Sequence, residues 1–213
     1  INLNGVIKTT SNDAPISNAP NITINGANIA VGANVSADST AGDVVLSGPT
    51  TLTNNVTFSG KDVALDGLDG DNHSVTFDAT STMIDAHTHS VSNIVNLIVT
   101  GDVGLNGTIA TTGNQSYGGD VTVLGNTALT AGSGAISLGT DGEVVGMTQN
   151  ETLTLGDANQ TGDVTLGGGS EVLLGGLNIG AGAFNLSIEA GDNVAVGINS
   201  SVEVLNNGTL TLT

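Results

Sequence analysis

Two stretches of the chain decide the fold: Gly42-Asp-Val-Val-Leu-Ser-Gly-Pro-Thr-Thr-Leu-Thr53 and Gly119-Asp-Val-Thr-Val-Leu-Gly-Asn-Thr-Ala-Leu-Thr130. Seven of their twelve positions are identical, and the two stretches lie 77 residues apart. Self-similarity at a fixed offset is the sequence mark of a solenoid, in which one supersecondary unit stacks on the next. We therefore expect the 213 residues to form repeated units around a shared core.

A shorter motif, Gly/Lys-Asp-Val-x-(Leu/Val), gives the length of the unit. It begins at Gly42, Lys61, Gly101, Gly119 and Gly162, so the gaps between copies are 19, 40, 18 and 43 residues. These gaps fit one, two, one and two units of about 20 residues.

The local pattern within each unit predicts β-strands. Runs such as Val44-Val45-Leu46 and Val75-Thr76-Phe77 are short, mostly alternate and are bounded by Gly, Asn or Asp. No stretch sustains the 3.6-residue period of a helix. Three strands and three turns in one unit make one coil, with Gly and Asn at its corners. We predict an all-β fold, a right-handed parallel β-helix with coils of about 19–21 residues, forming one segment over residues 1–213.

The first half of the chain carries an additional segment. Gly5-Val-Ile-Lys-Thr-Thr-Ser-Asn12 resembles Gly107-Thr-Ile-Ala-Thr-Thr-Gly-Asn114 at an offset of 102, which exceeds the other offset by 25. Residues 11–41 are therefore expected to be an insertion that projects from the rod, or an extra coil.

One continuous stretch resembles a known family. It runs Thr111-Thr-Gly-Asn-Gln-Ser-Tyr117-Gly-Gly-Asp-Val-Thr-Val-Leu-Gly-Asn-Thr-Ala-Leu-Thr-Ala131, followed by Gly134-Ala-Ile-Ser-Leu-Gly139. It is similar to the repeats of filamentous haemagglutinin-like, autotransporter-type bacterial surface proteins. The resemblance implies a β-helical passenger segment of a giant secreted adhesin. The Asn-Pro-Asn-Gly type secretion motif of such proteins is missing, which implies the passenger body and not the export-recognition domain.

Composition excludes several classes of partner. The chain has two Lys, no Arg, 20 acidic residues and a net charge of −18, so it cannot neutralise nucleic-acid phosphates. The same charge disfavours binding to an anionic lipid surface. The sequence contains no run of 18 apolar residues, so no membrane-spanning helix is expected. There is no Cys, so an exported form would be stabilised by its repetitive core. That core consists of Val, Leu, Ile and Ala, because aromatic residues make up 2% of the chain.

The two ends of the sequence carry an expectation of their own. The chain starts at Ile1 without a positively charged leader, and Thr209-Leu-Thr-Leu-Thr213 stops within a strand pattern. We expect a fragment of a longer protein, whose terminal coils stack on further coils of the same chain or on neighbouring subunits.

One local pattern suggests a metal centre. Asp85, His87 and His89 resemble the Asp-x-His-x-His motif that opens amidohydrolase barrels, and on a straight strand they would share one face. Those enzymes need a barrel of about 250 residues and further metal ligands from later strands. In this chain His73 is the one histidine outside the motif. We interpret the three residues as an exposed polar strand face.

A second group of acidic residues suggests calcium. Asp66, Asp69 and Asp71 cluster oxygen ligands, but their spacing does not fit an EF-hand loop. We interpret them as an acidic turn. The scarcity of basic residues and the absence of Cys and of a Gly-x-Ser-x-Gly elbow argue against an enzyme. We predict no catalytic, cofactor-binding or metal-binding residues and no cofactor.

Potential glycosylation acceptors of the Asn-x-Ser/Thr type are frequent. We attribute them to turn composition, and glycosylation is the alternative hypothesis. The eleven acceptors are Asn21, Asn34, Asn55, Asn72, Asn106, Asn114, Asn150, Asn159, Asn185, Asn199 and Asn207.

Two functions from different classes fit the sequence. The leading hypothesis is a structural or adhesive segment of a large secreted bacterial surface protein, a rod that presents binding surfaces to host or environmental ligands. The alternative is a β-sandwich subunit of an extracellular fibre or pilus assembled by strand exchange. The repeat favours the first, because a sandwich has no need of sequence self-similarity.

Overall fold

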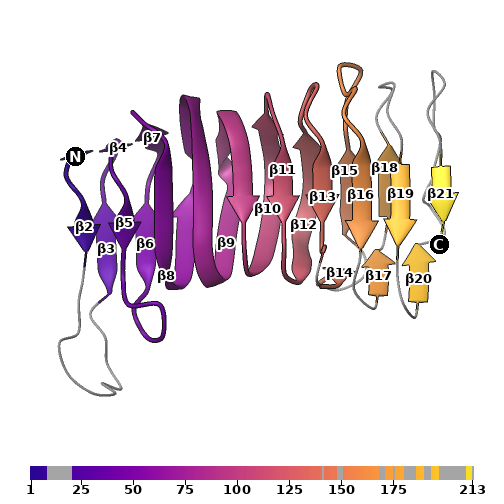
Figure 1. Cartoon of the computed structure of the whole chain (residues 1–213), viewed down its shortest axis with the longest axis horizontal. Helices are drawn as coiled ribbons and strands as arrows, with labels where there is room; N and C mark the ends of the chain where they lie inside the picture. The colour runs from indigo at the N-terminus through magenta and orange to yellow at the C-terminus, as the bar shows by residue number, and fades with distance from the viewer. Residues whose placement is uncertain are drawn as a thin grey trace.

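The computed structural model describes residues 1–8, 21–140, 142–147, 151–167, 171–174, 176–179, 186–189, 193–196 and 210–212. Within these ranges the chain forms β-strands and no helix. Every pairing between the described strands is parallel, and each joins strands of neighbouring coils. The predicted all-β parallel β-helix is confirmed, and its coils follow one another along the rod in chain order (Figure 1).

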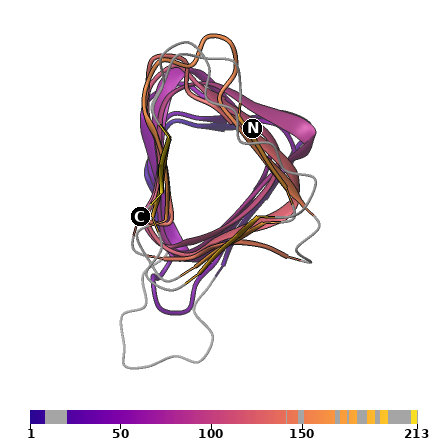
Figure 2. The same ribbon diagram turned by 90° about the vertical axis from the view of Figure 1, so that its right-hand side faces the viewer.

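The coils superpose into a triangle when the stack is viewed along its axis (Figure 2). Strands that pair directly share one side of this triangle, and we name the three sides face A, face B and face C. Face A contains β1 (Asn2–Leu3), β4 (Ile29–Val31), β7 (Thr50–Leu52), β15 (Thr152–Leu155) and β18 (Gly176–Ile179). Face B contains β2 (Ile7–Lys8), β5 (Val35–Ser36), β11 (Gln115–Tyr117), β13 (Ile136–Leu138), β16 (Val164–Gly167), β19 (Leu186–Glu189) and β21 (Leu210–Leu212). Face C contains β3 (Ile22–Asn25), β6 (Val44–Ser47), β14 (Val144–Gly146), β17 (Glu171–Leu174) and β20 (Asn193–Val196).

Four longer strands bend round corners and belong to more than one face. The longest, β9, contributes to all three faces in turn. These strands are β8 (Val56–Asp66), β9 (Leu68–Val99), β10 (Asp102–Thr111) and β12 (Val121–Thr130).

The 77-residue offset corresponds to four coils of face C. Successive pairings along this face join Val44, Val63, Thr82, Val103 and Val121. The first four copies of the Asp-Val motif therefore lie on one face, with gaps of one, two and one coils, as the repeat predicts.

The last copy of the motif lies on a different face. Val164 pairs with Ile136 on face B, whereas Val121 on face C pairs with Val144. The 43-residue gap is therefore not two coils, and this part of the predicted repeat is wrong. The motif needs only a corner followed by an inward-facing strand, and more than one corner of the triangle supplies that.

Coil length varies more than predicted. In the middle of the rod Gly104 pairs with Thr122, 18 positions along the chain. Further on, Val144 pairs with Val172, 28 positions along. The predicted coil length of about 19–21 residues describes the middle of the rod, because longer corner loops lengthen other coils without changing the strands.

The strands of the 11–41 segment lie within the stack. Its strands β3, β4 and β5 pair in register with strands of the following coil, and β4 and β5 also pair with β1 and β2. Residues 11–20 lie outside the described part of the chain. The match that suggested an insertion joins different faces, because Ile7 pairs with Val35 on face B and Ile109 pairs with Leu129 on face A.

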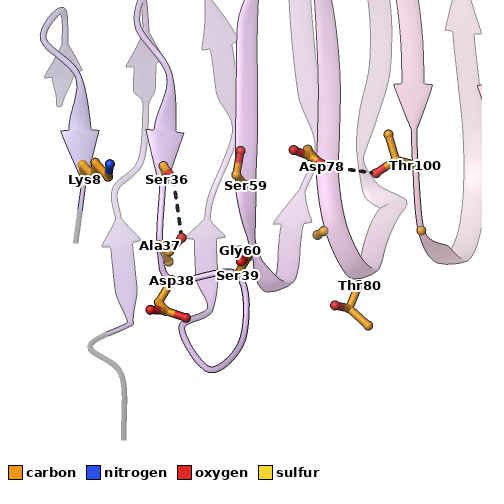
Figure 3. A pocket seen from close by; sticks show the side chains of 12 residues that line it. Lys8, Ser36, Ala37, Asp38, Ser39, Ser59, Gly60, Asp78, Thr80 and Thr100 are labelled. Carbon is orange, nitrogen blue, oxygen red and sulfur yellow. Dashed lines mark hydrogen bonds between the residues drawn. The ribbon is translucent and has the colours of Figure 1, made fainter. Parts of the chain in front are cut away.

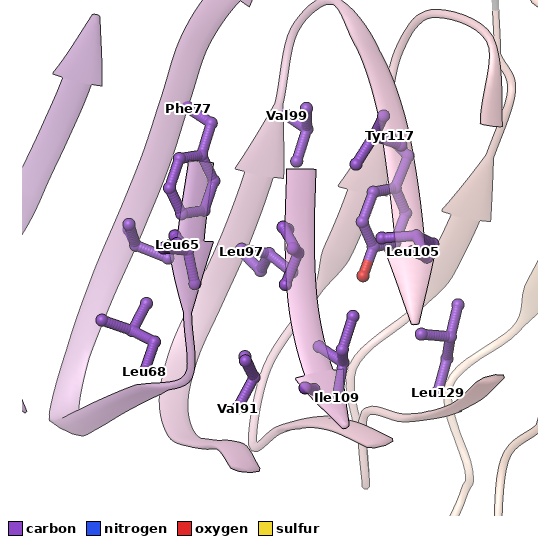
Figure 4. Packing of buried hydrophobic residues seen from close by; sticks show 14 of the residues in the cluster. Leu65, Leu68, Phe77, Val91, Leu97, Val99, Leu105, Ile109, Tyr117 and Leu129 are labelled. Atoms are coloured by element: carbon purple, nitrogen blue, oxygen red, sulfur yellow. The ribbon is translucent and has the colours of Figure 1, made fainter. Parts of the chain in front are cut away.

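The core consists of columns in which one inward side chain stacks on its counterpart in the next coil. On face B, Phe58 stacks on Phe77 with ring centroids 5.6 Å apart and planes 13° from parallel. Tyr117 continues this column beyond Val99, and all four residues are buried (Figure 4). Three of the chain's four aromatic residues thus occupy one column, and most of the other buried side chains are aliphatic.

At the corner that leads into face B, where the chain changes direction, side chains form hydrogen bonds between successive coils. A side-chain oxygen in one coil accepts a hydrogen bond from the main-chain N–H directly above it in the next coil, over 2.8–3.2 Å. These bonds satisfy amides that the bend leaves without a strand partner. The accepting residues are Asn34, Asn55, Ser74, Asn96 and Asn114, and the donating amides belong to Thr57, Ser74, Asn96, Asn114 and Ala135.

The corner that leads into face C uses mainly carboxylates for the same purpose. Asp102 accepts the N–H of Asp120 at 3.0 Å, and Asp120 accepts the N–H of Glu143 at 2.9 Å. The same contact joins Asn21 to the N–H of Asp43 at 2.9 Å. The Asp of the repeated Asp-Val motif is therefore a corner residue, and its Val is the first inward residue of the strand.

The inward column of face C contains a polar interruption. Thr82 lies between Val63 and Val103, it is 1% exposed, and its hydroxyl has no hydrogen-bond partner. A buried hydroxyl without a partner costs about 1–3 kcal/mol.

Replacing this threonine should stabilise the rod. Thr82→Val restores the valine column and removes the unpaired hydroxyl, so it should raise the free energy of unfolding by about 1 kcal/mol in chemical denaturation. The matched control is Val63→Thr, one coil away in the same column, which should lower it. A destabilising Thr82→Val would contradict the assigned column.

A second polar group in the core is fully satisfied. The buried Tyr117 hydroxyl donates to Oε1 of Gln115 at 3.0 Å, and Nε2 of Gln115 donates to the main-chain oxygen of Thr130 at 2.8 Å. Burial raises the pKa of the Tyr117 phenol far above its ordinary value.

This raised pKa predicts a loss of stability in alkali. The phenol stays protonated in the folded state but ionises at about pH 10 in the unfolded chain, so its contribution is complete below pH 10. Above that pH the free energy of unfolding should fall by up to about 1.4 kcal/mol per pH unit. Denaturation of Tyr117→Phe should lack this component, and Tyr117 is the single tyrosine. Equal pH slopes for the two proteins would refute the assignment.

Candidate functional surfaces

The potential glycosylation acceptors follow from the corner geometry. Asn34 and Asn114 stand at a corner, the next residue points inward, and Ser36 and Ser116 point outward on face B. A corner Asn, followed by an inward residue and then by an outward Ser or Thr, gives the triplet Asn-x-Ser/Thr. The frequency of this triplet is therefore explained by the coil itself. Asn150, Asn185, Asn199 and Asn207 lie outside the described residues.

The histidine motif does not form one strand face. Ala86 pairs with Gly107 and Val91 pairs with Ile109, so the four residues from 87 to 90 lie opposite a single residue of the next coil. His87 is exposed on this bulge, and the assumption that positions i, i+2 and i+4 share a face is wrong here.

Each of the motif's polar groups has a separate role at the corner between face C and face A. Asp85 accepts the N–H of His87 at 3.0 Å and the Nδ2 of Asn106 at 3.2 Å. His89 turns back to the preceding coil, where its Nδ1 lies 2.9 Å from Oδ1 of Asp66. These contacts hold the corner, and each of them engages a group of the motif with a different partner.

The acidic turn is likewise bound into local structure. Asp69 accepts hydrogen bonds from Nδ2 of Asn93 at 3.0 Å and from the N–H of Asp71 at 3.1 Å. Asp71 has a positive φ of 43°, which Asp tolerates better than most residues. Among the described residues, no group of three or more His, Asp or Glu side chains is placed to share a metal ion.

A polar groove crosses several coils near the corner between face B and face C. It has a volume of about 780 Å³. One wall is a row of outward side chains from successive coils, namely Ser36, Ser59, Asp78 and Thr100, with Lys8 at its end (Figure 3). Within this row the hydroxyl of Thr100 donates to Oδ1 of Asp78 at 3.2 Å.

The opposite wall includes the loop over residues 37–42. Asp38 shapes this loop, because its carboxylate accepts the N–H of Thr40 at 2.9 Å and the hydroxyl of Thr40 at 2.6 Å. The main-chain oxygen of Asp38 also accepts the N–H of Gly42 at 2.8 Å. Asp38, Ser39 and, further along the rod, Thr80 therefore stand across the groove from the hydroxyl row (Figure 3).

The floor of the groove lacks large side chains. It consists of Ala37, Gly60, Ala79 and Gly101, one from each of four successive coils. A Cβ added at Gly60 would come within 2.9 Å of the main-chain oxygen of Gly42, and one at Gly101 would clash with the main-chain oxygen of Ala79. Close coil packing thus requires glycine at these two positions, and the same requirement keeps the groove open.

The charge of the groove is mainly negative. Asp38 and Asp78 line it, and Lys8 is its single cationic residue. The other lysine of the chain, Lys61, lies outside the groove and donates to Asp62 at 2.9 Å, a hydrogen bond that raises the pKa of Lys61.

The groove was not predicted from the sequence, because its residues are dispersed along the chain. Ser36, Ser59 and Asp78 are separated by 23 and 19 positions. The sequence does hold one signal for the groove: each of these residues directly follows a buried residue of one inward column. Phe58 precedes Ser59, and Phe77 precedes Asp78. Finding it requires the register between coils, which the degenerate motif does not fix on face B.

The chain matches no protein-family model, and comparisons with curated proteins and with solved structures likewise gave no match. No helix with the length and apolarity of a membrane span occurs in the part of the chain that the structure describes.

Proposed function

We propose that the chain is a structural and adhesive segment of a large secreted surface protein, and that it has no catalytic activity. The observation that carries this proposal is the parallel stack of coils that the described strands form, closed by corner hydrogen bonds. Such a stack extends by adding coils, each about 4.8 Å thick, and therefore forms a rod. A rod can hold a binding surface away from the cell to which the protein is attached.

The outer surface supports the same proposal. Outward positions of the strands carry mostly small polar residues, and the net charge of −18 favours solubility. The partners we propose are further coils of the same chain or neighbouring subunits, together with host or environmental ligands on the exposed faces. The resemblance to filamentous haemagglutinin-like repeats points in the same direction.

The fibre-subunit alternative loses its structural basis. A β-sandwich pairs its strands in antiparallel sheets, whereas all strand pairings among the described residues are parallel. The β-sandwich is therefore wrong as a fold for this chain.

The location of the protein tests the proposal. Antibodies raised against the purified chain should label intact, unpermeabilised cells of the source organism, and external protease should remove the label. A cytoplasmic protein of the same cells serves as the control that must stay unlabelled. Labelling that requires permeabilisation would overturn the surface assignment, and turnover in a panel of glycosidase, lyase and esterase substrates would overturn the absence of catalysis.

A further inference from the structure

We propose that the groove between the 37–42 loop and the row Ser36–Ser59–Asp78–Thr100 binds a neutral, hydroxyl-rich glycan chain that lies along the axis of the rod. This inference deepens the proposed function and rests on it, because a polysaccharide partner is met outside the cell. It assigns a ligand class to one surface of the rod.

The polar groups of the groove suit the chemistry of sugars. Serine and threonine hydroxyls donate and accept, and carboxylates accept, so together they match the mixed donor and acceptor character of sugar hydroxyls. Asp78 accepts one hydrogen bond, from Thr100, and a carboxylate offers about four acceptor sites. Hydrogen bonds to a charged acceptor are the strongest of this set.

The shape of the groove suits a chain more than a small compact molecule. Its wall repeats once per coil, at a spacing of about 4.8 Å, and a sugar ring in an extended glycan has a similar length. The floor of Ala37, Gly60, Ala79 and Gly101 carries no side chain larger than a methyl group over four coils. Successive sugar rings can therefore meet one polar side chain of the row in each successive coil.

The negative charge of the groove favours a neutral glycan over an acidic one. Asp38 and Asp78 face the groove, and the whole chain carries a net charge of −18. Sulfated or uronic-acid polymers would bring like charges together, which costs free energy at each site.

A peptide ligand fits the groove less well. An extended peptide binds by adding a strand to a free sheet edge or by filling apolar pockets. Here the main chain beside the groove is already paired between coils, as in the bonds from Ala37 N–H to Ser59 O and from Lys61 N–H to Gly42 O, each 2.8 Å. The lining residues include no large apolar side chain.

The test measures binding of defined oligosaccharides to the full 213-residue chain by titration calorimetry and NMR. The neutral probes are cellohexaose, mannohexaose and N-acetylated chitohexaose, and the comparison probes are hexagalacturonate and a hexapeptide of alternating glycine and serine. At least one neutral hexasaccharide should bind, and binding should be weak because no aromatic ring lines the groove.

Two variants and a matched control locate the site. Thr80→Trp fills the groove from an exposed position, and Asp78→Ala removes a charged acceptor; each should weaken binding about tenfold or more. Thr108→Trp places the same bulk on an exposed threonine of face A and should leave binding unchanged. Circular dichroism of all three variants checks that the rod is intact.

Three results would overturn the proposal. They are the failure of every neutral hexasaccharide to bind, binding of only the hexagalacturonate or the peptide, and an equal loss of binding in Thr108→Trp. None of these results affects the labelling of intact cells, so failure of the glycan site and failure of the surface assignment are distinguishable.

Discussion

The structure depends on one constraint at the corners of the triangle, where the chain leaves the direction of a strand and its amides lose their regular partners. A side-chain oxygen of one coil accepts the amide of the next, as in the 2.9 Å bond from the N–H of Asn114 to Oδ1 of Asn96. Buried or half-buried amides must be paired. Repetition of this bond keeps the coils in register, and the register in turn places like side chains on one another in the core.

This constraint also explains the composition. Asparagine is frequent because it places a neutral acceptor at the corner into face B, and aspartate recurs because it does so at the corner into face C. The acidic corner residues contribute to the net charge of −18, because the chain has only two lysines to balance them. Hydroxyl residues are common because the outward positions of the strands face solvent. The groove arises where the 37–42 loop leaves the stack beside one row of these hydroxyls.

The β-helix could be predicted from the sequence, whereas the groove and the bulge at the histidine motif could not. The motif around Val44, Val63, Val103 and Val121 predicted parallel coils because it records one corner and one inward column. It did not predict that Val164 belongs to face B, because different corners accept the same Asp-Val pair. The histidine motif was misjudged because a straight strand was assumed through residues 87–90, where the chain forms a bulge. The groove residues are joined only by register between coils, and that register depends on loop lengths that vary from corner to corner.

Hydrogen exchange of the corner amides tests the central claim most directly. The account predicts that the amides of Ser74, Asn114, Asp120 and Ala135 exchange as slowly as neighbouring strand amides, because each donates to a side-chain oxygen of the preceding coil. In Asn96→Ala the amide of Asn114 should lose its protection while that of Asp120, at a different corner, keeps it. Corner amides that exchange in the wild-type protein as fast as those of exposed loops would contradict the account.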